Sequence, residues 1–328
     1  MGRKARWASR APLAISLVVV LGLSFGSAVS AQVARWQTLN LETLQLLQQG
    51  KYEEGIRVAN EAVRVAEETF GKNHPNVATS LGNLGALYYQ HGQYAKAEPL
   101  LKRAVTLLEE TVGPNHPVLS NILSTLVALY ITKAQYAKAE PYGKRALAIA
   151  EKTLGPDHPH VAASLNNLAL VYHAQGKYDQ AEPLHKRALA IREKALGPDH
   201  PDVAASLNNL AALYQAQGQY AKVEPLYQRA LVIVEKVLGP EHPNVAASLN
   251  NLAALYYNQG RYAQVEPLWK RALKIFETAL GPNHPDVATA LKNLAELYAK
   301  MGRRKEANRL FDRAARIRAS PSSSGWGR

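Results

Sequence analysis

The chain has 328 residues, of which 20% are charged and 47% are apolar, and its net charge is +13. This composition excludes a wholly disordered chain and one that is embedded throughout in a membrane. The sequence contains no cysteine, which excludes disulfides, thiolate nucleophiles and zinc sites built on sulfur. A folded, water-soluble chain is therefore expected.

The first 31 residues have the three parts of a secretory signal peptide. Four basic residues within the first ten precede an uncharged, largely apolar run over residues 11–26, and small residues follow as far as Ala31. We therefore expect residues 1–31 to be a signal peptide cleaved near Ala31, with the mature chain periplasmic or secreted. The alternative is an uncleaved anchor, although this 16-residue run is shorter than the ~20 residues of a spanning helix. Cleavage would remove four basic residues and lower the net charge from +13 to +9.

A 42-residue repeat fills most of the remaining chain. A histidine followed by proline recurs at this step six times, at His74, His116, His158, His200, His242 and His284. A glycine three residues before each histidine keeps the same step. Such a period indicates an array of stacked repeats, because each unit is one supersecondary element that cannot bury its apolar face alone.

Each copy of the repeat predicts two amphipathic helices, here called helix A and helix B. In one copy, apolar residues at helical spacing define helix A with Val161, Leu165, Leu168, Ala169 and Tyr172. A second set defines helix B with Tyr178, Ala181, Leu184, Ala188 and Ile191. Each repeat is therefore a helical hairpin, and the small residues Ala169, Ala181 and Ala188 are expected where helices approach closely.

Glycine and proline mark the ends of these helices. Gly176 can take the left-handed conformation that closes helix A, and Gly155 can close the preceding helix B. Pro159 fits the first turn of the next helix A, and Asp157 or the asparagines at equivalent positions could cap its free amides.

The array extends over residues 32–318 and comprises about seven hairpins. It begins with a divergent hairpin at about Gln37–Phe70 and ends with helices near Pro285–Met301 and Arg304–Arg318. Divergent end repeats are typical of caps. The tail at 319–328 is rich in serine and glycine and is expected to be disordered.

Short motifs within the repeat resemble the tetratricopeptide repeat. They are Leu-Ala-x-x-Tyr, Gln-Gly-x-Tyr, Ala-Glu-Pro-Leu and Arg-Ala-Leu. The 42-residue step and the segment from His200 to Gly218 are similar to the repeats of kinesin light chains. The heptad segment that joins a kinesin light chain to its motor is not in this sequence, so a motor-adaptor role does not transfer.

The resemblance implies an all-α fold of tandem helical hairpins, stacked into a right-handed superhelical solenoid. Its concave wall would be formed mainly by the A helices and would receive a peptide segment of a partner. The family pattern places the residues before the Leu-Ala pair in this groove, which are here Asn83, Asn166, Asn167, Asn208, Asn209, Asn250, Asn251 and Asn293. One turn later the groove would carry Tyr89, His173, Gln215 and Tyr257.

A row of asparagines can hydrogen-bond a peptide backbone largely independently of its sequence, because each amide offers donors and an acceptor without charge. The alternative is structural, with the asparagines capping or bridging neighbouring helices. Lysines and arginines are scarce at the groove positions, so a clamp for a terminal carboxylate is not expected.

Basic residues gather instead on the B helices. Lys102, Lys144, Lys186 and Lys270 each follow a glutamate by four residues, at the spacing of a stabilising helical ion pair. Most of this row is interpreted as structural. In the last hairpin the basic residues outnumber the acidic ones, and Arg303, Arg304, Lys305 and Arg309 form a possible patch for an anionic surface. The same residues could instead be a soluble cap that prevents end-to-end stacking, which is the interpretation favoured here.

No catalytic, metal or cofactor site is predicted. The six repeated histidines cannot share one ion, because stacked helices lie ~8–10 Å apart while metal ligands lie within ~2 Å of the metal. We therefore expect a non-catalytic scaffold that binds another polypeptide, with neither a small-molecule substrate nor nucleic acid as partner and no membrane-spanning segment in the mature chain. The alternative is a basic binder of anionic polymers or surfaces, such as nucleic acid or a cell-envelope polymer, through helix B and the last hairpin.

Overall fold

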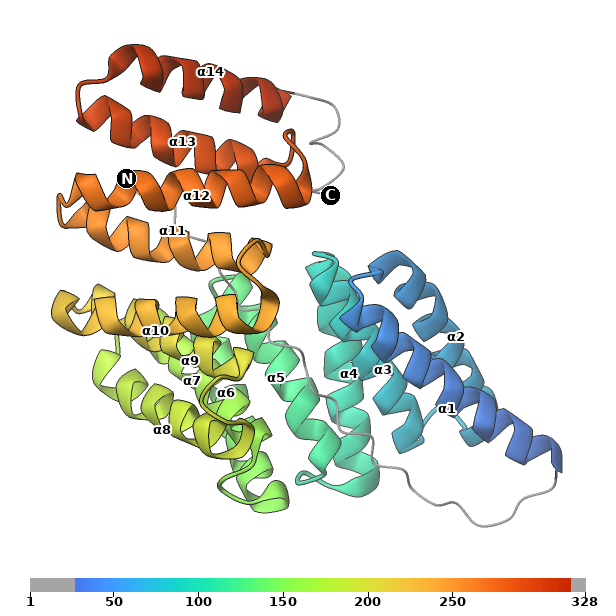
Figure 1. The fold of residues 1–328 in the computed structure, drawn as a ribbon. Helices are drawn as coiled ribbons and strands as arrows, with labels where there is room; N and C mark the ends of the chain where they lie inside the picture. Colours follow the sequence, from blue (N-terminus) through green and yellow to red (C-terminus); the bar gives the residue numbers. More distant parts are fainter. Residues whose placement is uncertain (1–26, 320–328) are drawn as a thin grey trace. The chain divides into compact units, whose positions relative to one another are not determined.

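The computed structural model describes residues 27–319, which form fourteen α-helices and no strand (Figure 1). The A helices are α1 (Ser27–Gln48), α3 (Pro75–Gln90), α5 (Pro117–Thr132), α7 (Pro159–Ala174), α9 (Pro201–Ala216), α11 (Pro243–Asn258) and α13 (Pro285–Lys300). The B helices are α2 (Tyr52–Phe70), α4 (Tyr94–Val112), α6 (Tyr136–Leu154), α8 (Tyr178–Leu196), α10 (Tyr220–Leu238), α12 (Tyr262–Leu280) and α14 (Arg304–Ala319). The prediction of an all-α fold of seven tandem hairpins is confirmed for these residues.

The A helices from α3 onward begin at the repeated His-Pro pair. In α7 the N-cap residue is His158, and its imidazole Nδ1 accepts a hydrogen bond from the backbone N–H of His160 at 3.1 Å. Pro159 occupies the first helical position, where the missing N–H is not needed. The expectation that Asp157 caps this helix is wrong, because the aspartate lies one residue before the N-cap position.

Glycines end the helices, as predicted. Gly155 follows α6 with a φ of 84°, and its N–H is donated to the carbonyl oxygen of Glu151. Gly176 follows α7 with a φ of 74° and donates its N–H to the carbonyl oxygen of His173. Positive φ is readily adopted only by glycine, so these two positions fix where each helix stops.

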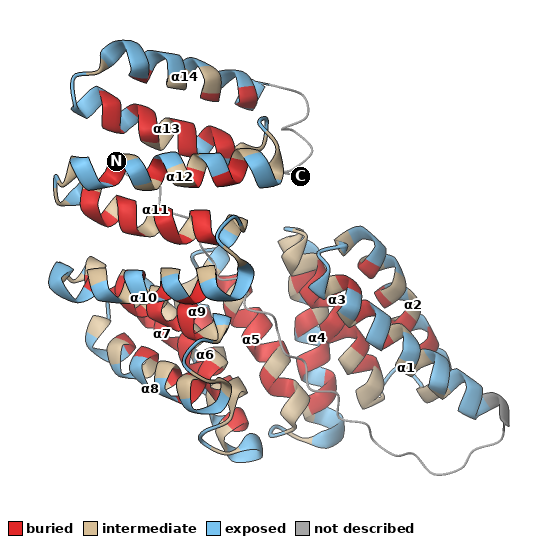
Figure 2. Ribbon diagram, in the orientation of Figure 1, coloured by how far each residue is buried: buried red, intermediate tan, exposed pale blue. Residues whose placement is uncertain are grey.

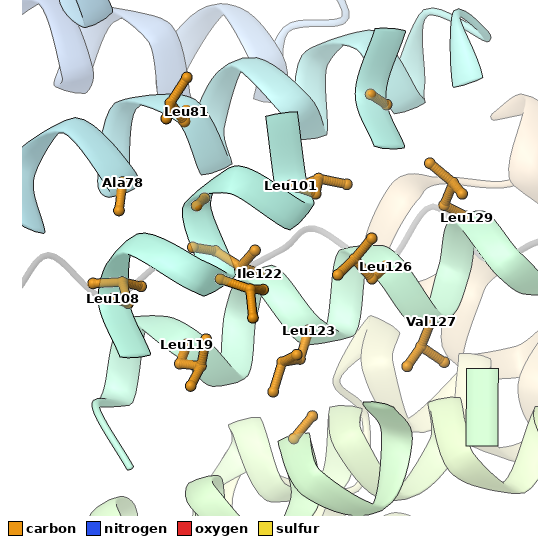
Figure 3. Close-up of a cluster of buried hydrophobic side chains, with 14 of the residues drawn as sticks. Ala78, Leu81, Leu101, Leu108, Leu119, Ile122, Leu123, Leu126, Val127 and Leu129 are labelled. Atoms are coloured by element: carbon orange, nitrogen blue, oxygen red, sulfur yellow. The ribbon is translucent and has the colours of Figure 1, made fainter. Parts of the chain in front are cut away.

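The chain divides into two compact units, and the boundary between Ile191 and Arg192 falls within α8. In the first unit, α3, α4 and α5 enclose an aliphatic core (Figure 3). Leu81 of α3, Leu101 of α4 and Leu126 of α5 are each 1% exposed or less. The small residues Ala169, Ala181 and Ala188 are fully buried.

The second unit comprises residues 192–319 and repeats the same layering, with the buried face of each helix turned toward its neighbours (Figure 2). Helix A residues such as Leu207, Leu249 and Leu291 are at most 1% exposed. Helix B contributes larger side chains here, and Trp269 and Phe276 of α12 are 5% and 4% exposed. Three hairpins after the boundary therefore share one continuous apolar interior.

The predicted bounds fit the last hairpin of the array better than the first. The last hairpin agrees with the prediction to within one residue at each end. The first hairpin was predicted from Gln37, whereas α1 begins at Ser27 and the predicted cleavage after Ala31 falls inside its first turns. Residues 1–26 of the predicted leader and 320–328 of the predicted tail lie outside the described residues. Among residues 27–319, no helix is both long enough and apolar enough to cross a membrane.

Candidate protein-binding face

The predicted asparagines of the first unit are used partly inside the fold. Asn83 of α3 is 6% exposed and donates through Nδ2 to Oδ1 of Asn40 at 2.9 Å. Asn166 of α7 is 4% exposed, and its Oδ1 lies 2.8 Å from Nδ1 of the fully buried His185 on α8. These two side chains bridge helices, which is the structural role considered above. Asn167, the neighbour of Asn166, is only half-buried.

In the second unit, the two members of each asparagine pair occupy different environments. Oδ1 of Asn208 on α9 and Oδ1 of Asn250 on α11 are buried and have no hydrogen-bond partner among the described residues. The position that His185 holds in the first unit is taken here by Tyr227 and Trp269, so the asparagine–histidine bond is not repeated. The first member of each pair therefore faces the interior of its hairpin.

The second member of each pair and the equivalent asparagine of α13, which follows Lys292, form what we call the asparagine row. It consists of Asn209 on α9, Asn251 on α11 and Asn293 on α13, which hold the same position in three successive A helices of one unit. All three are half-buried, and within residues 192–319 none of their side chains makes a hydrogen bond. Ala212 and Ala254 lie one turn further along α9 and α11, so only a methyl group stands beside Asn209 and Asn251 there. The row thus presents unused donors and acceptors, which lie next to small side chains at Asn209 and Asn251 and next to Glu296 at Asn293.

The predicted groove residues one turn later contact helix B of their own hairpin. The ring of Tyr89 lies 5.8 Å from that of Tyr94, and the ring of His173 lies 5.7 Å from that of Tyr178. In the second unit, Gln215 accepts a hydrogen bond from the hydroxyl of Tyr227 at 3.3 Å. These contacts hold the two helices of a hairpin together at the end where the chain turns.

Tyr257 lies in an aromatic cluster on α11 and α12. Its ring centroid is 5.5 Å from those of both Tyr262 and Trp269. Burial, with smaller contributions from Tyr262 and Glu296, raises the pKa of the Tyr257 hydroxyl above its ordinary value. The hydroxyl therefore stays protonated and able to donate a hydrogen bond across the physiological pH range.

The predicted lysine–glutamate pairs on helix B are confirmed. Lys102, Lys144, Lys186 and Lys270 lie 2.7–2.8 Å from glutamates one turn earlier. Three of these glutamates, Glu98, Glu140 and Glu266, also bind the following hairpin, a role that was not predicted. Glu266, for example, accepts from Arg303 at 2.9 Å and from the Tyr298 hydroxyl at 2.9 Å. Hydrogen bonding to Lys270, and then to Arg303 and Tyr298, lowers the pKa of Glu266 to about 2.

The arginines that follow these lysines form a second set of contacts that was not predicted. Within the described residues, each pairs with a glutamate 36 positions earlier on the preceding helix B: Arg103–Glu67, Arg145–Glu109, Arg187–Glu151, Arg229–Glu193, Arg271–Glu235 and Arg313–Glu277. The signal was present in the sequence, because these glutamates also recur every 42 residues. Most of the basic row on helix B is therefore neutralised inside the array.

The four basic residues of the last hairpin have different environments. Arg303 pairs with Glu266 and Glu306, and its guanidinium carbon lies 3.8 Å from the centre of the Tyr298 ring. Arg304, Lys305 and Arg309 are exposed, and no described carboxylate lies within ion-pairing distance of them. Arg303 is thus a structural residue, whereas the other three present free charge.

The described residues also contain no group of three or more histidine, aspartate or glutamate side chains that could hold a metal ion. The repeated histidines lie at separate helix starts, where five of the six imidazoles accept a capping hydrogen bond and that of His116 does not.

The geometry defines a class of protein, an array of tandem helical hairpins with a repeated A-helix face. The family model of the tetratricopeptide repeat matches residues 44–110, 92–152, 118–194, 160–231, 202–268 and 246–320. The chain therefore belongs to the tetratricopeptide repeat family, and its repeats are of the kinesin-light-chain type. Repeats of this family generally mediate protein–protein interactions, and their scaffolds are typically non-catalytic.

Solved structures share this fold. Kinesin-light-chain TPR-like repeats from Podosopora anserina are 32% identical, with a TM-score of 0.55 over 62% of this chain and 97% of that chain. BtubC (BKLC) from P. vanneervenii is 24% identical, with a TM-score of 0.55 over 78% of this chain and 94% of that chain. The apo form of RapI, at 16% identity, shares the fold with a TM-score of 0.63 over 86% of this chain and 97% of that chain. Among curated proteins, no relative matches this chain.

Proposed function

We propose that this protein is a non-catalytic scaffold that binds a segment of another polypeptide along the A helices of its second unit. The observation that supports the proposal is the asparagine row. Asn209, Asn251 and Asn293 are half-buried amides without an internal hydrogen bond among the described residues. An amide in that state has lost part of its water without gaining a protein partner, so a bound main chain would satisfy it.

The spacing of the row suits an extended segment. Neighbouring packed helices lie ~8–10 Å apart, and an extended chain advances ~3.3 Å per residue. One asparagine would therefore meet every third residue of the partner. Because the amides bind main-chain groups, this contact gives affinity, and side chains such as Tyr257 would add selectivity.

The test compares two double variants of the full chain. In Asn209→Ala with Asn251→Ala the row loses two amides, and in the control, Asn244→Ala with Asn308→Ala, two exposed asparagines of the same unit are lost elsewhere. Partners are captured from envelope extract and identified, and the segment found is then titrated as a synthetic peptide. Two lost hydrogen bonds should weaken binding about fivefold or more, at ~0.5–1.5 kcal/mol each.

Salt gives the test a second readout. Contacts to uncharged amides should respond weakly to ionic strength, whereas contacts made by lysine and arginine should weaken steeply. Equal capture by both double variants, or capture that high salt abolishes, would reject the asparagine row as the binding face.

We further propose that the chain is exported and cleaved after Ala31. Cleavage there would leave Gln32 as the first residue, inside α1, and would preserve the anchor of this helix. That anchor is Trp36, which donates through Nε1 to Oγ of Ser80 at 2.8 Å and lies edge-on to Phe70. N-terminal sequencing of the protein from a periplasmic fraction tests the proposal, since an intact Met1 on the purified protein contradicts it.

A further inference from the structure

The outer side of α14 differs from the outer sides of the other B helices in the second unit. Three outer positions are occupied on α10 by Ala221, Pro225 and Val232, and on α12 by Ala263, Pro267 and Lys274. The equivalent residues on α14 are Lys305, Arg309 and Arg316. All nine residues are exposed, so these positions face outward on each of the three helices. Only on the last helix do all three carry positive charge.

Lys305, Arg309 and Arg316 form what we call the basic stripe. Residues separated by four and eleven positions lie within an arc of about 40° on an α-helix, and the stripe is about 16 Å long. None of the three side chains has an ion pair or hydrogen bond among the described residues. Two exposed acidic side chains of α14 lie close to the stripe, Asp312 and Glu306, and Glu306 is paired with Arg303. The stripe therefore keeps a net positive charge.

The turn that leads into α14 adds to this surface. Met301 is 40% exposed, and the flanking Lys300 and Arg304 are exposed and have no ion pair within residues 192–319. The nearby Arg303 is different, because Glu266 and Glu306 neutralise it. An exposed thioether between unpaired cations therefore lies at the same end of the helix as Lys305.

We propose that the basic stripe and the turn at Met301 bind the phosphate headgroups of an anionic phospholipid surface. Charge complementarity supports this occupant, because basic side chains close to an anionic membrane each contribute ~1 kcal/mol. The cations lie on both the turn and the helix, so they are spread over an area that an extended surface can contact. The exposed thioether of Met301 would also enter the headgroup layer. This activity is separate from polypeptide binding, since the asparagine row lies on A helices and the stripe on a B helix.

The experiment measures sedimentation of the full chain with phosphatidylcholine vesicles that contain or lack phosphatidylglycerol. The test variant is Lys305→Gln with Arg309→Gln and Arg316→Gln. The matched control is Lys51→Gln with Lys72→Gln and Lys152→Gln, which removes the same charge from three exposed lysines of the first unit that also have no described ion pair. Both variants lose three positive charges and differ only in where these charges lie. A difference in their vesicle binding therefore measures the contribution of the stripe.

The expected result is binding that requires phosphatidylglycerol, that falls on the order of a hundredfold in the stripe variant, and that remains in the control. Thermal unfolding followed by circular dichroism establishes that both variants are folded. Equal binding by the two variants would overturn the proposal, as would binding that does not depend on phosphatidylglycerol. Duplex DNA is the second ligand tested, and capture of DNA through the stripe without capture of anionic vesicles would also overturn it.

Discussion

Arg271 of α12 donates through Nη1 to Oε1 of Glu235 on α10 at 2.6 Å, so that one helix B is tied to the helix B of the preceding hairpin. The same guanidinium donates through Nη2 to the carbonyl oxygen of Pro240 at 3.2 Å, in the loop between α10 and α11. One side chain therefore fixes two parts of the neighbouring repeat. Because the pair recurs along the array, it acts at the junctions between hairpins, which are the interfaces that make a repeat protein cooperative.

We expect the Arg271–Glu235 pair to contribute modestly to stability. Its side chains are 40% and 29% exposed, and partly exposed ion pairs typically contribute up to ~1 kcal/mol. A double-mutant cycle with Arg271→Met and Glu235→Gln, measured by urea unfolding at low and high salt, should give a coupling energy of this size that declines with salt. A coupling energy of zero at low salt would show that the pair does not hold the hairpins together.

The second prediction concerns pH and rests on His74, the N-cap of α3. Its Nδ1 accepts from the N–H of Asn76 at 3.1 Å, and burial holds its pKa below the ordinary value. Below about pH 6.5 the unfolded chain takes up a proton that the folded chain resists, so the free energy of unfolding falls until the pH drops below the folded-state pKa. A protonated imidazole also loses the acceptor and places positive charge at a helix N-terminus. Replacing His74 by asparagine, which caps without titrating, should reduce this acid sensitivity in urea unfolding at neutral and mildly acidic pH.

His116 is the internal control for the cap. It occupies the same position before α5, and burial likewise lowers its pKa, but its Nδ1 has no hydrogen-bond partner among the described residues. At neutral pH, His74→Ala should therefore cost ~1 kcal/mol as a lost cap, and His116→Ala should cost less. Equal losses of stability in the two variants would show that the hydrogen bond of His74 is not the source of its contribution.

The repeat period allowed most of the fold to be predicted, because spacing alone determines which residues share a helix face. Leu165, Leu168 and Ala169 were assigned to the interior on that basis, and each is at most 4% exposed. The start of α1 was missed because the first helix A has neither the His-Pro pair nor its glycine. The histidine caps were missed because aspartate and asparagine are the commoner N-cap residues.

The candidate site was harder to predict, because one repeat position can serve different purposes in different hairpins. Asn166 and Asn208 are equivalent in sequence, yet Asn166 bonds to His185, whereas Tyr227 at the position of His185 donates its hydroxyl to Gln215 and Oδ1 of Asn208 has no described partner. The difference depends on the residue that helix B places opposite each asparagine. A pattern read along the A helices alone contains no information on that partner.

Arg192 provides the third prediction. It is 5% exposed on α8, and its Nη1 donates to the carbonyl oxygen of Asp202 at 3.0 Å and to Oγ of Ser206 at 2.8 Å. Burial lowers the pKa of this guanidinium, and the negative charge of Asp202 offsets only part of the lost hydration. Equivalent positions on α10 and α12 hold Val234 and Phe276.

We therefore expect Arg192→Met to raise the free energy of unfolding by about 1 kcal/mol. Replacing a buried charge with an apolar side chain of similar length removes a desolvation cost and retains the packing of the stem. Urea unfolding of the variant and the unmodified chain measures the change. A clear loss of stability would mean that the two hydrogen bonds outweigh the desolvation of the guanidinium.

The last prediction concerns the complementary sizes of facing side chains in the first unit. A methyl group added to Gly85 of α3 would lie 2.7 Å from the side chain of Leu101 on α4, which is too close for carbon atoms. The next hairpin reverses the sizes, with Val127 on α5 and Gly143 on α6 at the equivalent positions. Gly85→Val alone should therefore destabilise the chain by about 1–3 kcal/mol through overpacking, and Leu101→Gly alone should destabilise it through a cavity and a flexible backbone. The double variant copies the arrangement of α5 and α6. Its loss of stability should therefore be smaller than the sum of the two single losses by at least ~1 kcal/mol. Additive losses in urea unfolding of the four chains would show that the two positions do not compensate for each other's size.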